Sequence, residues 1–229
     1  MRMIKVVAEG QTETNFAKNV LWPHFYTLNK NVVPITLQTS KDLSKGRVYK
    51  GGIISYSKFK KEVDRHLKYA MSHKGTYVTT MVDLYGLPTD FPGYDQACRI
   101  QNVYQKVEYL EQEIKADILS AHPNGERIFL PYLQLHEFEA LLFVDLEKLA
   151  ATCFEYQSDI CKLGNEVAGM NPEEINHDYR TAPSKRILSA VPNYDKVIMG
   201  TEVAQAIGLD RLRTHCKHFD HWIKLLENI

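Results

Sequence analysis

The sequence lacks an excess of charge of either sign, and it lacks long apolar runs. Its 229 residues carry 28 lysines and arginines against 28 aspartates and glutamates, so the overall field predicts no strong non-specific attraction to nucleic acid or anionic membranes. No apolar run approaches the roughly 20 residues of a membrane-spanning helix, and the first residues lack the apolar stretch of a secretory signal. We therefore expect a soluble, cytoplasmic protein without membrane association.

The sequence also lacks a regular cysteine pattern. Its four cysteines are irregularly spaced in a chain of moderate length, which argues against a disulfide framework. They are Cys98, Cys153, Cys161 and Cys216. We expect reduced thiols.

Short apolar runs alternate with helical patterns over much of the chain. Strands are predicted at residues 4–8, 32–37, 76–83 and 128–135, and helices at 12–26, 56–71 and 95–120, with a loop at 40–52. This alternation predicts an α/β fold with a mostly parallel four-stranded sheet and right-handed crossovers. Past residue 137 the pattern predicts short helices alone. We expect an α/β domain at 1–145 and a helical portion at 146–229 packed on it.

Acidic residues follow three of the predicted strands. Glu9 and Glu13 follow the first, Asp83 ends the third, and Glu137 and Glu139 follow the fourth. Sites in open α/β sheets form at the carboxyl ends of strands. Carboxylates are the ligands of hard cations such as Mg²⁺, and Mn²⁺ is an alternative. The competing interpretation is that these acids cap helices or face water.

Several motifs carry a resemblance that spans nearly the whole chain. They are EGQTETNF, VDLYGLPTDFPG, PYLQLHEFEALLF, NPEEIN, APSKRI, YDKVIMG and IGLDRLRTHCKHFDHW. Together they resemble a Toprim domain, the metal-binding fold of topoisomerases, primases and OLD-type nucleases. More narrowly, they resemble a bacterial Toprim-like family of unknown function that is associated with phage-defence systems.

The resemblance implies roles for the acidic residues. Glu9 matches the Toprim glutamate, which acts as a metal ligand or general acid/base, and Asp83 matches the first aspartate of a DxD metal motif. Tyr85 stands where the second aspartate is expected, which puts the standard two-metal arrangement in doubt. Glu137 or Glu139 is then a candidate for the missing carboxylate. Glu13, one helical turn after Glu9, is a candidate ligand of a second metal.

A nuclease also needs cations on the side that faces the substrate. Lys185 and Arg186 begin a short predicted helix, and Ser184 is a candidate cap for it. Lys185 is included among the candidate catalytic residues, and Arg180 and Lys196 are further candidates for substrate binding. The competing interpretation is an ordinary solvated basic surface.

Two kinds of side chain near the acidic motifs extend the candidate site. His136 precedes Glu137, and because unperturbed histidine side chains in general change charge near neutral pH, it is a candidate ligand or proton shuttle. The tyrosines Tyr85, Tyr94 and Tyr132 are candidates for stacking on bases, although half-buried packing is the more common role of tyrosine.

The acidic residues predict a divalent-metal site, and the resemblance implies a Mg²⁺-dependent nuclease in an anti-phage defence system. DNA, tRNA and other RNA stay open as substrates, and so does assembly into a homo-oligomer. The alternative is a non-catalytic regulatory or sensor subunit that binds a partner ATPase on a Toprim-like scaffold, because a fold alone does not fix function.

Overall fold

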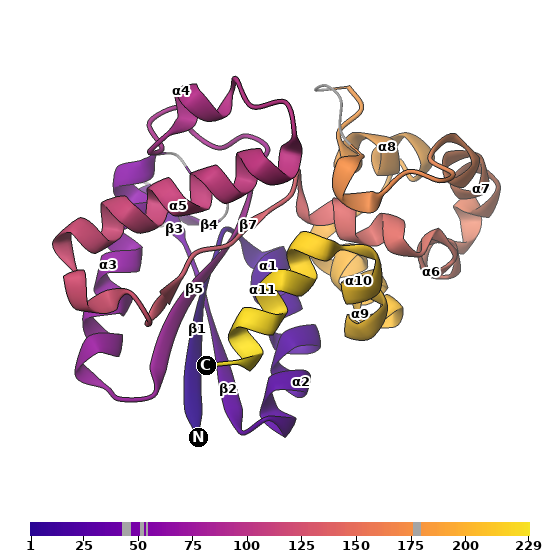
Figure 1. The fold of residues 1–229 in the computed structure, drawn as a ribbon. Coiled ribbons are helices and arrows are strands. Elements are labelled where there is room, and N and C mark those ends of the chain that lie inside the picture. Colours follow the sequence, from indigo (N-terminus) through magenta and orange to yellow (C-terminus); the bar gives the residue numbers. More distant parts are fainter. Residues whose placement is uncertain (43–46, 51–52, 54, 176–179) are drawn as a thin grey trace. The chain divides into compact units, whose positions relative to one another are not determined.

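The computed structural model describes residues 1–42, 47–50, 53, 55–175 and 180–229. The chain forms two compact units, Met1–Leu133 and Gln134–Ile229, which are described separately below (Figure 1). From the sequence we predicted the division after residue 145.

The first unit contains a parallel sheet. Its strands follow the order β2-β1-β5-β6, and a short β7 also pairs with β5. The bounds are β1 Arg2–Ala8, β2 Lys30–Thr36, β5 Thr76–Asp83, β6 Phe129–Leu130 and β7 Leu133–Gln134. The predicted α/β class and parallel sheet are confirmed. The predicted last strand is divided into β6 and β7, with Pro131 between them, because proline has no N–H to donate to a ladder.

Helices cover both faces of this sheet. Figure 1 shows α3 and α5 together on one face, and the run of α1, η1 and α2 on the other. The bounds are α1 Gln11–Phe16, η1 Ala17–Leu21, α2 Trp22–Thr27, α3 Tyr56–Ser72, α4 Tyr94–Ala97, α5 Val103–Ala121 and η2 Pro123–Gly125. Asp117 of α5 accepts hydrogen bonds from Tyr56 and Lys60 of α3, at 2.5 and 2.7 Å. The helix predicted at 95–120 is divided because Asn102 caps α5, its side chain accepting from the N–H of Tyr104 at 3.0 Å.

The order of the strands reverses at β1. The chain passes from β1 to β2 on one side, and then crosses back to place β5 on the other side of β1. Right-handed crossovers in opposite directions put their helices on opposite faces, as observed. The carboxyl ends of β1 and β5 therefore flank the point where ligands typically bind in an open α/β sheet.

Part of the predicted loop at 40–52 is a hairpin. Strands β3 (Gln38–Asp42) and β4 (Arg47–Lys50) pair antiparallel, with Ser40 opposite Tyr49 and Asp42 opposite Arg47. This prediction was wrong because the segment is polar and lacks the alternation of apolar residues that marks a half-buried strand. Residues 43–46 and 51–52 of the predicted loop lie outside the described residues.

The described elements of the second unit are helical, apart from Gln134, which ends strand β7. All seven residues of η3 are buried, so this 3₁₀ segment lies in the core of the unit. The bounds are η3 Phe138–Val144, α6 Leu146–Thr152, η4 Phe154–Tyr156, α7 Gln157–Glu166, η5 Pro172–Glu174, α8 Pro183–Ala190, η6 Lys196–Gly200, α9 Thr201–Ile207, α10 Leu209–His215 and α11 Lys217–Glu227. The sequence did not predict α10.

In the part of the chain that the structure describes, no helix combines the length and the apolar character that a bilayer crossing requires.

Candidate functional site

Glu9 and Asp83 meet at the point where the strand order reverses. Glu9 follows β1 directly, and its N–H donates to the carbonyl oxygen of Met81 in β5 at 2.9 Å. The N–H of Asp83 donates in turn to Oε2 of Glu9, also at 2.9 Å. Asp83 is 7% exposed and Glu9 is half-buried. The two strand ends thus bring two predicted site residues together.

Glu13 takes part in the start of α1. Its Oε2 accepts the N–H of Gly10 at 2.8 Å, and its side chain is 2% exposed. The neighbouring Thr14 hydroxyl bonds the Gly10 carbonyl oxygen and the Thr36 hydroxyl, both at 2.8 Å. The bond between Glu13 and the Gly10 N–H is one half of a capping box, an arrangement that stabilises the first turn of a helix. One oxygen of Glu13 therefore stabilises the start of α1, whereas from the sequence we predicted Glu13 as a metal ligand.

The tyrosines differ in exposure. Tyr85, two residues after Asp83, is 36% exposed and precedes Gly86, whose φ is +76°. Tyr132 is 1% exposed, so its ring is packed in the core and cannot stack on a base. Tyr85 keeps its candidate role, and Tyr94 is half-buried.

In the second unit, Glu137 binds the first turn of α8. Its Oε2 accepts the N–H of Ser184 at 2.8 Å, and its Oε1 accepts the Ser184 hydroxyl at 3.0 Å. The N-cap position of α8 is Ala182, which has no side-chain acceptor, so Ser184 does not cap its own helix as predicted. The carboxylate of Glu137 supplies the acceptor instead, and its negative charge suits the positive end of the helix.

Glu173, in the motif NPEEIN, plays the same part for α11. It is fully buried, and its two oxygens accept the N–H groups of His218 at 3.1 Å and Phe219 at 2.9 Å. Two acidic motifs of the second unit thus hold helix N-termini.

Glu139 is buried beside Lys196 in the second unit. It is 1% exposed, and its Oε2 lies 3.3 Å from Nζ of Lys196. Burial raises the pKa of Glu139; Lys196 acts to lower it, and the charge of Glu137 acts to raise it. Burial, and then the charge of Glu139, also raise the pKa of Tyr194. Lys196, predicted to bind substrate, pairs with a buried carboxylate, and its substrate role stays a prediction.

His136 has an unusual backbone conformation. Its φ is +59°, in the left-handed region that residues other than glycine rarely adopt, and its side chain is 8% exposed. Such conformations cost on the order of 1–3 kcal/mol and cluster at functional sites. The strain lies next to Glu137.

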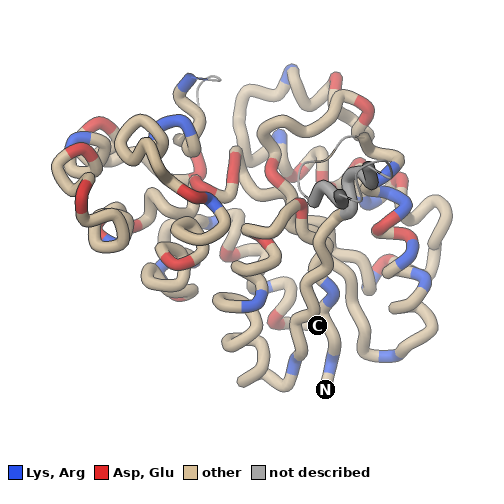
Figure 2. Tube along the Cα trace, turned by 180° about the vertical axis from the view of Figure 1, so that it is seen from behind, with Lys and Arg blue, Asp and Glu red and all other residues tan. Residues whose placement is uncertain are grey.

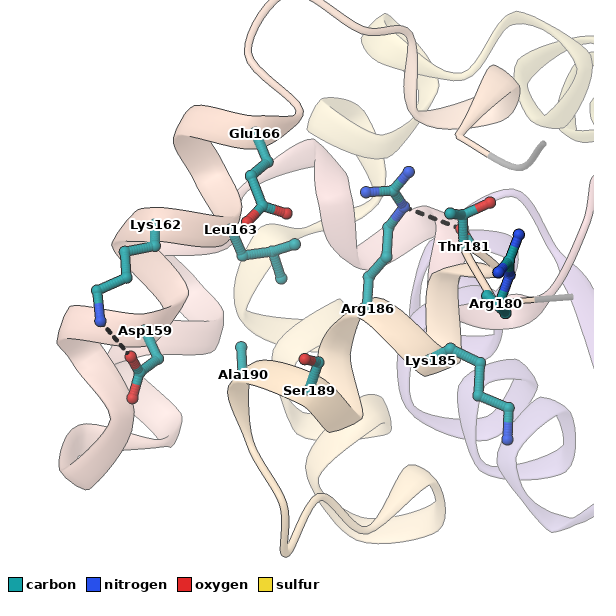
Figure 3. A pocket seen from close by; sticks show the side chains of 10 residues that line it. All are labelled: Asp159, Lys162, Leu163, Glu166, Arg180, Thr181, Lys185, Arg186, Ser189 and Ala190. Carbon is teal, nitrogen blue, oxygen red and sulfur yellow. Dashed lines mark hydrogen bonds and ion pairs between the residues drawn. The ribbon is translucent and has the colours of Figure 1, made fainter. Parts of the chain in front are cut away.

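Three of the predicted basic residues line one cavity in the second unit. Arg180, Lys185 and Arg186 border a cavity of about 360 Å³ between α7 and α8, shown in Figure 3. The sequence missed the contribution of α7, which adds Lys162, Asp159 and Glu166. The sequence signal that could have indicated these residues is the charged face of α7. On this face Lys162 Nζ lies 2.7 Å from Asp159 Oδ1. Elsewhere basic and acidic positions are interspersed along both units (Figure 2).

The donor set at the strand ends fits a hard cation. Among the described residues no three His, Cys, Asp or Glu side chains form a group that could hold a metal. Mg²⁺, however, is usually held by one or two carboxylates together with waters and substrate phosphates. Glu9 and Asp83 supply two carboxylates of that kind. Glu137 and Glu139 belong to the other unit, and their role as a third ligand stays a prediction.

Comparison with known families gives one match. Residues 8–227 match the family described as Domain of unknown function (DUF4276). The chain belongs to this family. Neither the curated proteins nor the solved structures contain a match. Glu9, Asp83 and the cavity between α7 and α8 all lie within the matched DUF4276 region.

Proposed function

We propose that the protein is a Mg²⁺-dependent nuclease of the Toprim type, which hydrolyses phosphodiesters in DNA or RNA as part of a bacterial anti-phage defence system. The main support is the pairing of Glu9 with Asp83 where the strand order reverses. Two carboxylates from neighbouring strand ends, at the usual ligand position of the fold, suit a metal that bridges to a phosphate.

Glu9 and Asp83 would bind the metal ion together at this site. The hydrogen bond from the Asp83 N–H fixes one oxygen of Glu9 and so orients its carboxylate. Asp83 is almost buried at the end of β5, so its carboxylate is held by a rigid strand rather than by a mobile loop. Glu9 and Asp83 would hold Mg²⁺ or Mn²⁺, which when bound activates water and stabilises charge on the phosphate. The Tyr85 ring, which is 36% exposed, would contact a base of the substrate.

The experiment compares the wild type with Glu9→Gln and Asp83→Asn. Labelled single-stranded DNA, duplex DNA, RNA and tRNA are incubated with Mg²⁺, with Mn²⁺ and with EDTA. We expect metal-dependent cleavage by the wild type and a loss of at least 100-fold, on the order of one lost catalytic group, in both variants. The matched controls are Glu108→Gln on the exposed surface of α5 and Asp95→Asn on α4, which should cleave like the wild type. Equal cleavage by all variants would contradict the proposal.

A second candidate function is a regulatory subunit that binds a partner ATPase. It is favoured by the structural use of two predicted site residues, because Glu13 holds the start of α1 and Glu137 holds the start of α8. Tyr85 in place of a second aspartate favours it as well. In this case isothermal titration should detect no heat of Mg²⁺ or Mn²⁺ binding, and an ATPase should copurify at fixed stoichiometry. Metal binding that Asp83→Asn abolishes would exclude a purely structural role for the pair.

A further inference from the structure

The outer side of α3 carries a row of basic side chains. The helix has five lysines and arginines against two acids, in a chain whose overall net charge is zero. Four of these cations follow one another at spacings of three and four positions, so they lie on one side of the helix. This basic stripe consists of Lys58, Lys61, Arg65 and Lys68, and all four residues are exposed. Basic positions recur along α3 in Figure 2.

Both acids of α3 lie beside the stripe and contact other groups. Oδ1 of Asp64 lies 3.0 Å from Nε2 of His122, beyond the end of α5. Oε1 of Glu62 accepts a hydrogen bond from Arg65 and lies 3.2 Å from Nε2 of His66. The pair with Glu62 therefore compensates part of the charge of the stripe, at Arg65.

Two lysines of the stripe carry charge that no acid of the described chain compensates. Among the described residues, no ion pair or hydrogen bond joins Lys61 or Lys68 to a carboxylate. Residues 43–46, 51–52 and 54, which lie outside the description shortly before α3, include no aspartate or glutamate. The two ammonium groups are thus available to an external anion.

The opposite side of α3 indicates what kind of anion fits. Phe59, Val63 and Leu67 lie on that side and are buried, where α3 packs on the sheet. A helix that lies on a membrane needs its apolar face for the lipid. Because the apolar face of α3 is already covered, its exposed side suits a soluble polyanion better than a bilayer.

The length of the stripe matches a nucleic acid backbone. Ten residues separate Lys58 from Lys68, which corresponds to roughly 15 Å along the helix axis. Each strand of duplex DNA has one phosphate per about 3.4 Å of axis, so this length spans about four phosphates, one for each cation. Three of the cations also border a surface hollow of about 610 Å³ on this side of the helix.

The stripe begins at the edge of the sheet that carries the acid pair. A helix that connects parallel strands runs antiparallel to them, so α3 begins at the carboxyl edge of the sheet. One contact confirms this placement, because the N–H of Tyr56 donates to Oδ2 of Asp90, in the segment after β5, at 2.9 Å. Glu9 and Asp83 lie at the same edge. A strand bound along α3 would therefore extend toward them.

We propose that the basic stripe of α3 binds the sugar-phosphate backbone of a nucleic acid that extends to the carboxyl edge of the sheet. Contacts to phosphates carry no sequence information, so this binding is independent of base sequence. The inference rests on the proposed function, which makes a nucleic acid the substrate. The binding itself needs no metal and is measurable without cleavage.

The experiment measures fluorescence anisotropy with the full chain in EDTA at several salt concentrations. The probes are labelled single-stranded DNA, duplex DNA and RNA, each in two unrelated sequences. We expect the two sequences of each kind to bind alike, with an affinity that falls as salt rises. Vesicles of phosphatidylcholine and phosphatidylserine are tested in parallel by sedimentation.

Variants with opposite expected effects make the test independent of folding defects. Lys61→Gln and Lys68→Gln should each weaken binding roughly threefold and lower the slope of log affinity against log salt by about 0.7–0.9. Glu62→Gln releases Arg65 from its carboxylate and should strengthen binding several-fold. The matched control is Lys18→Gln, because Lys18 is an exposed lysine of η1, on the other face of the sheet (Figure 1). It should bind like the wild type.

The outcomes separate the stripe from the nuclease. Loss of binding in the stripe variants, with no cleavage by the wild type in Mg²⁺ or Mn²⁺, would support the stripe and contradict the nuclease. Metal-dependent cleavage, with stripe variants that bind like Lys18→Gln, would overturn the stripe alone. The stripe is also overturned if no oligonucleotide binds, or if the vesicles bind and the oligonucleotides do not.

Discussion

The N–H of Asp83 donates a hydrogen bond of 2.9 Å to Oε2 of Glu9, joining the ends of two neighbouring parallel strands. The side chain of one predicted site residue is thus positioned by the backbone of the other. Because of this bond, Glu9 contributes to the fold as well as to any chemistry at the site. The two contributions must be separated before a loss of activity can be assigned to Glu9.

Substitutions that differ in their acceptor atoms separate them. In Glu9→Gln the amide oxygen can still accept from the Asp83 N–H, so we expect a loss of unfolding free energy below about 0.5 kcal/mol. Glu9→Ala leaves this part-buried N–H without its acceptor and should cost about 1 kcal/mol. Urea unfolding in EDTA measures both, with Glu108→Gln as the control. Equal losses in the Gln and Ala variants would mean that the hydrogen bond does not stabilise the strand ends.

The contact of Glu137 with Ser184 predicts an energetic coupling within the second unit. Ser184→Ala should cost about 1 kcal/mol, and Glu137→Ala about 1–2 kcal/mol, because it removes the acceptor for both Ser184 groups. In the Glu137→Ala background, Ser184→Ala should cost little, since its partner is already gone. A double-mutant cycle by urea unfolding measures the difference. Ser189→Ala, in an exposed serine of the same helix, should add independently to Glu137→Ala. Strict additivity of the Glu137 and Ser184 changes would rule out the cap.

The strands of the first unit could be predicted because their signals are local. Strand β5 covers residues 76–83, the predicted range, since a run of β-forming residues begins directly after Gly75, whose φ is +78°. The alternation of strands and helices was sufficient to predict a parallel sheet. The meeting of Glu9 and Asp83 followed from that order, because carboxyl ends of parallel strands share an edge.

The rest of the candidate site depends on contacts that leave no local signal. Glu137 and Ser184 are 47 positions apart, and neither neighbourhood indicates that a distant carboxylate caps α8. Likewise, Lys162 and Arg186 line the same cavity because α7 packs beside α8, which the charge pattern of either helix does not reveal. The sequence identified residues whose side chains could bind a metal or a substrate. It could not distinguish a carboxylate that caps a helix from one that binds a metal.

Because Glu139 is buried, we expect the free energy of unfolding to depend on pH in a specific way. Burial raises its pKa above the ordinary value of 4.5, against the opposing effect of Lys196. The folded state then binds a proton at pH values where the unfolded state has lost it, so the free energy of unfolding falls as pH rises from 4.5 through the folded pKa. Glu139→Gln removes this titration, and Lys196 is exposed enough to stay hydrated. The stability of the variant relative to wild type should therefore increase over that pH range.

Urea unfolding of both proteins at several pH values tests this expectation. The control is Glu147→Gln, an exposed glutamate in the first turn of α6, whose substitution should leave the shape of the pH curve unchanged. Parallel pH curves for the wild type and Glu139→Gln would show that Glu139 titrates alike in the folded and unfolded chains.

The close approach of Tyr194 to Gly200 gives a prediction about packing near Glu139. A Cβ added at Gly200 would lie 2.5 Å from Oη of Tyr194, which is shorter than any real contact of this type. Gly200 has a helical φ of −60°, so by propensity alone Gly200→Ala would stabilise the helix by about 1 kcal/mol. Because of the clash we expect the opposite sign, a loss of about 1–3 kcal/mol.

Removal of the hydroxyl should reverse that loss. Among the described residues Oη of Tyr194 is buried and has no hydrogen-bond partner, so Tyr194→Phe should be neutral or slightly stabilising. In the double variant the nearest atoms to the new Cβ would be Cε1 of Phe138 at 3.4 Å and Cζ of residue 194 at 3.6 Å, both ordinary contacts, and most of the loss should be recovered. Urea unfolding of the two single variants and the double variant measures this recovery. If Gly200→Ala alone stabilises the protein, the hydroxyl of Tyr194 does not pack against Gly200.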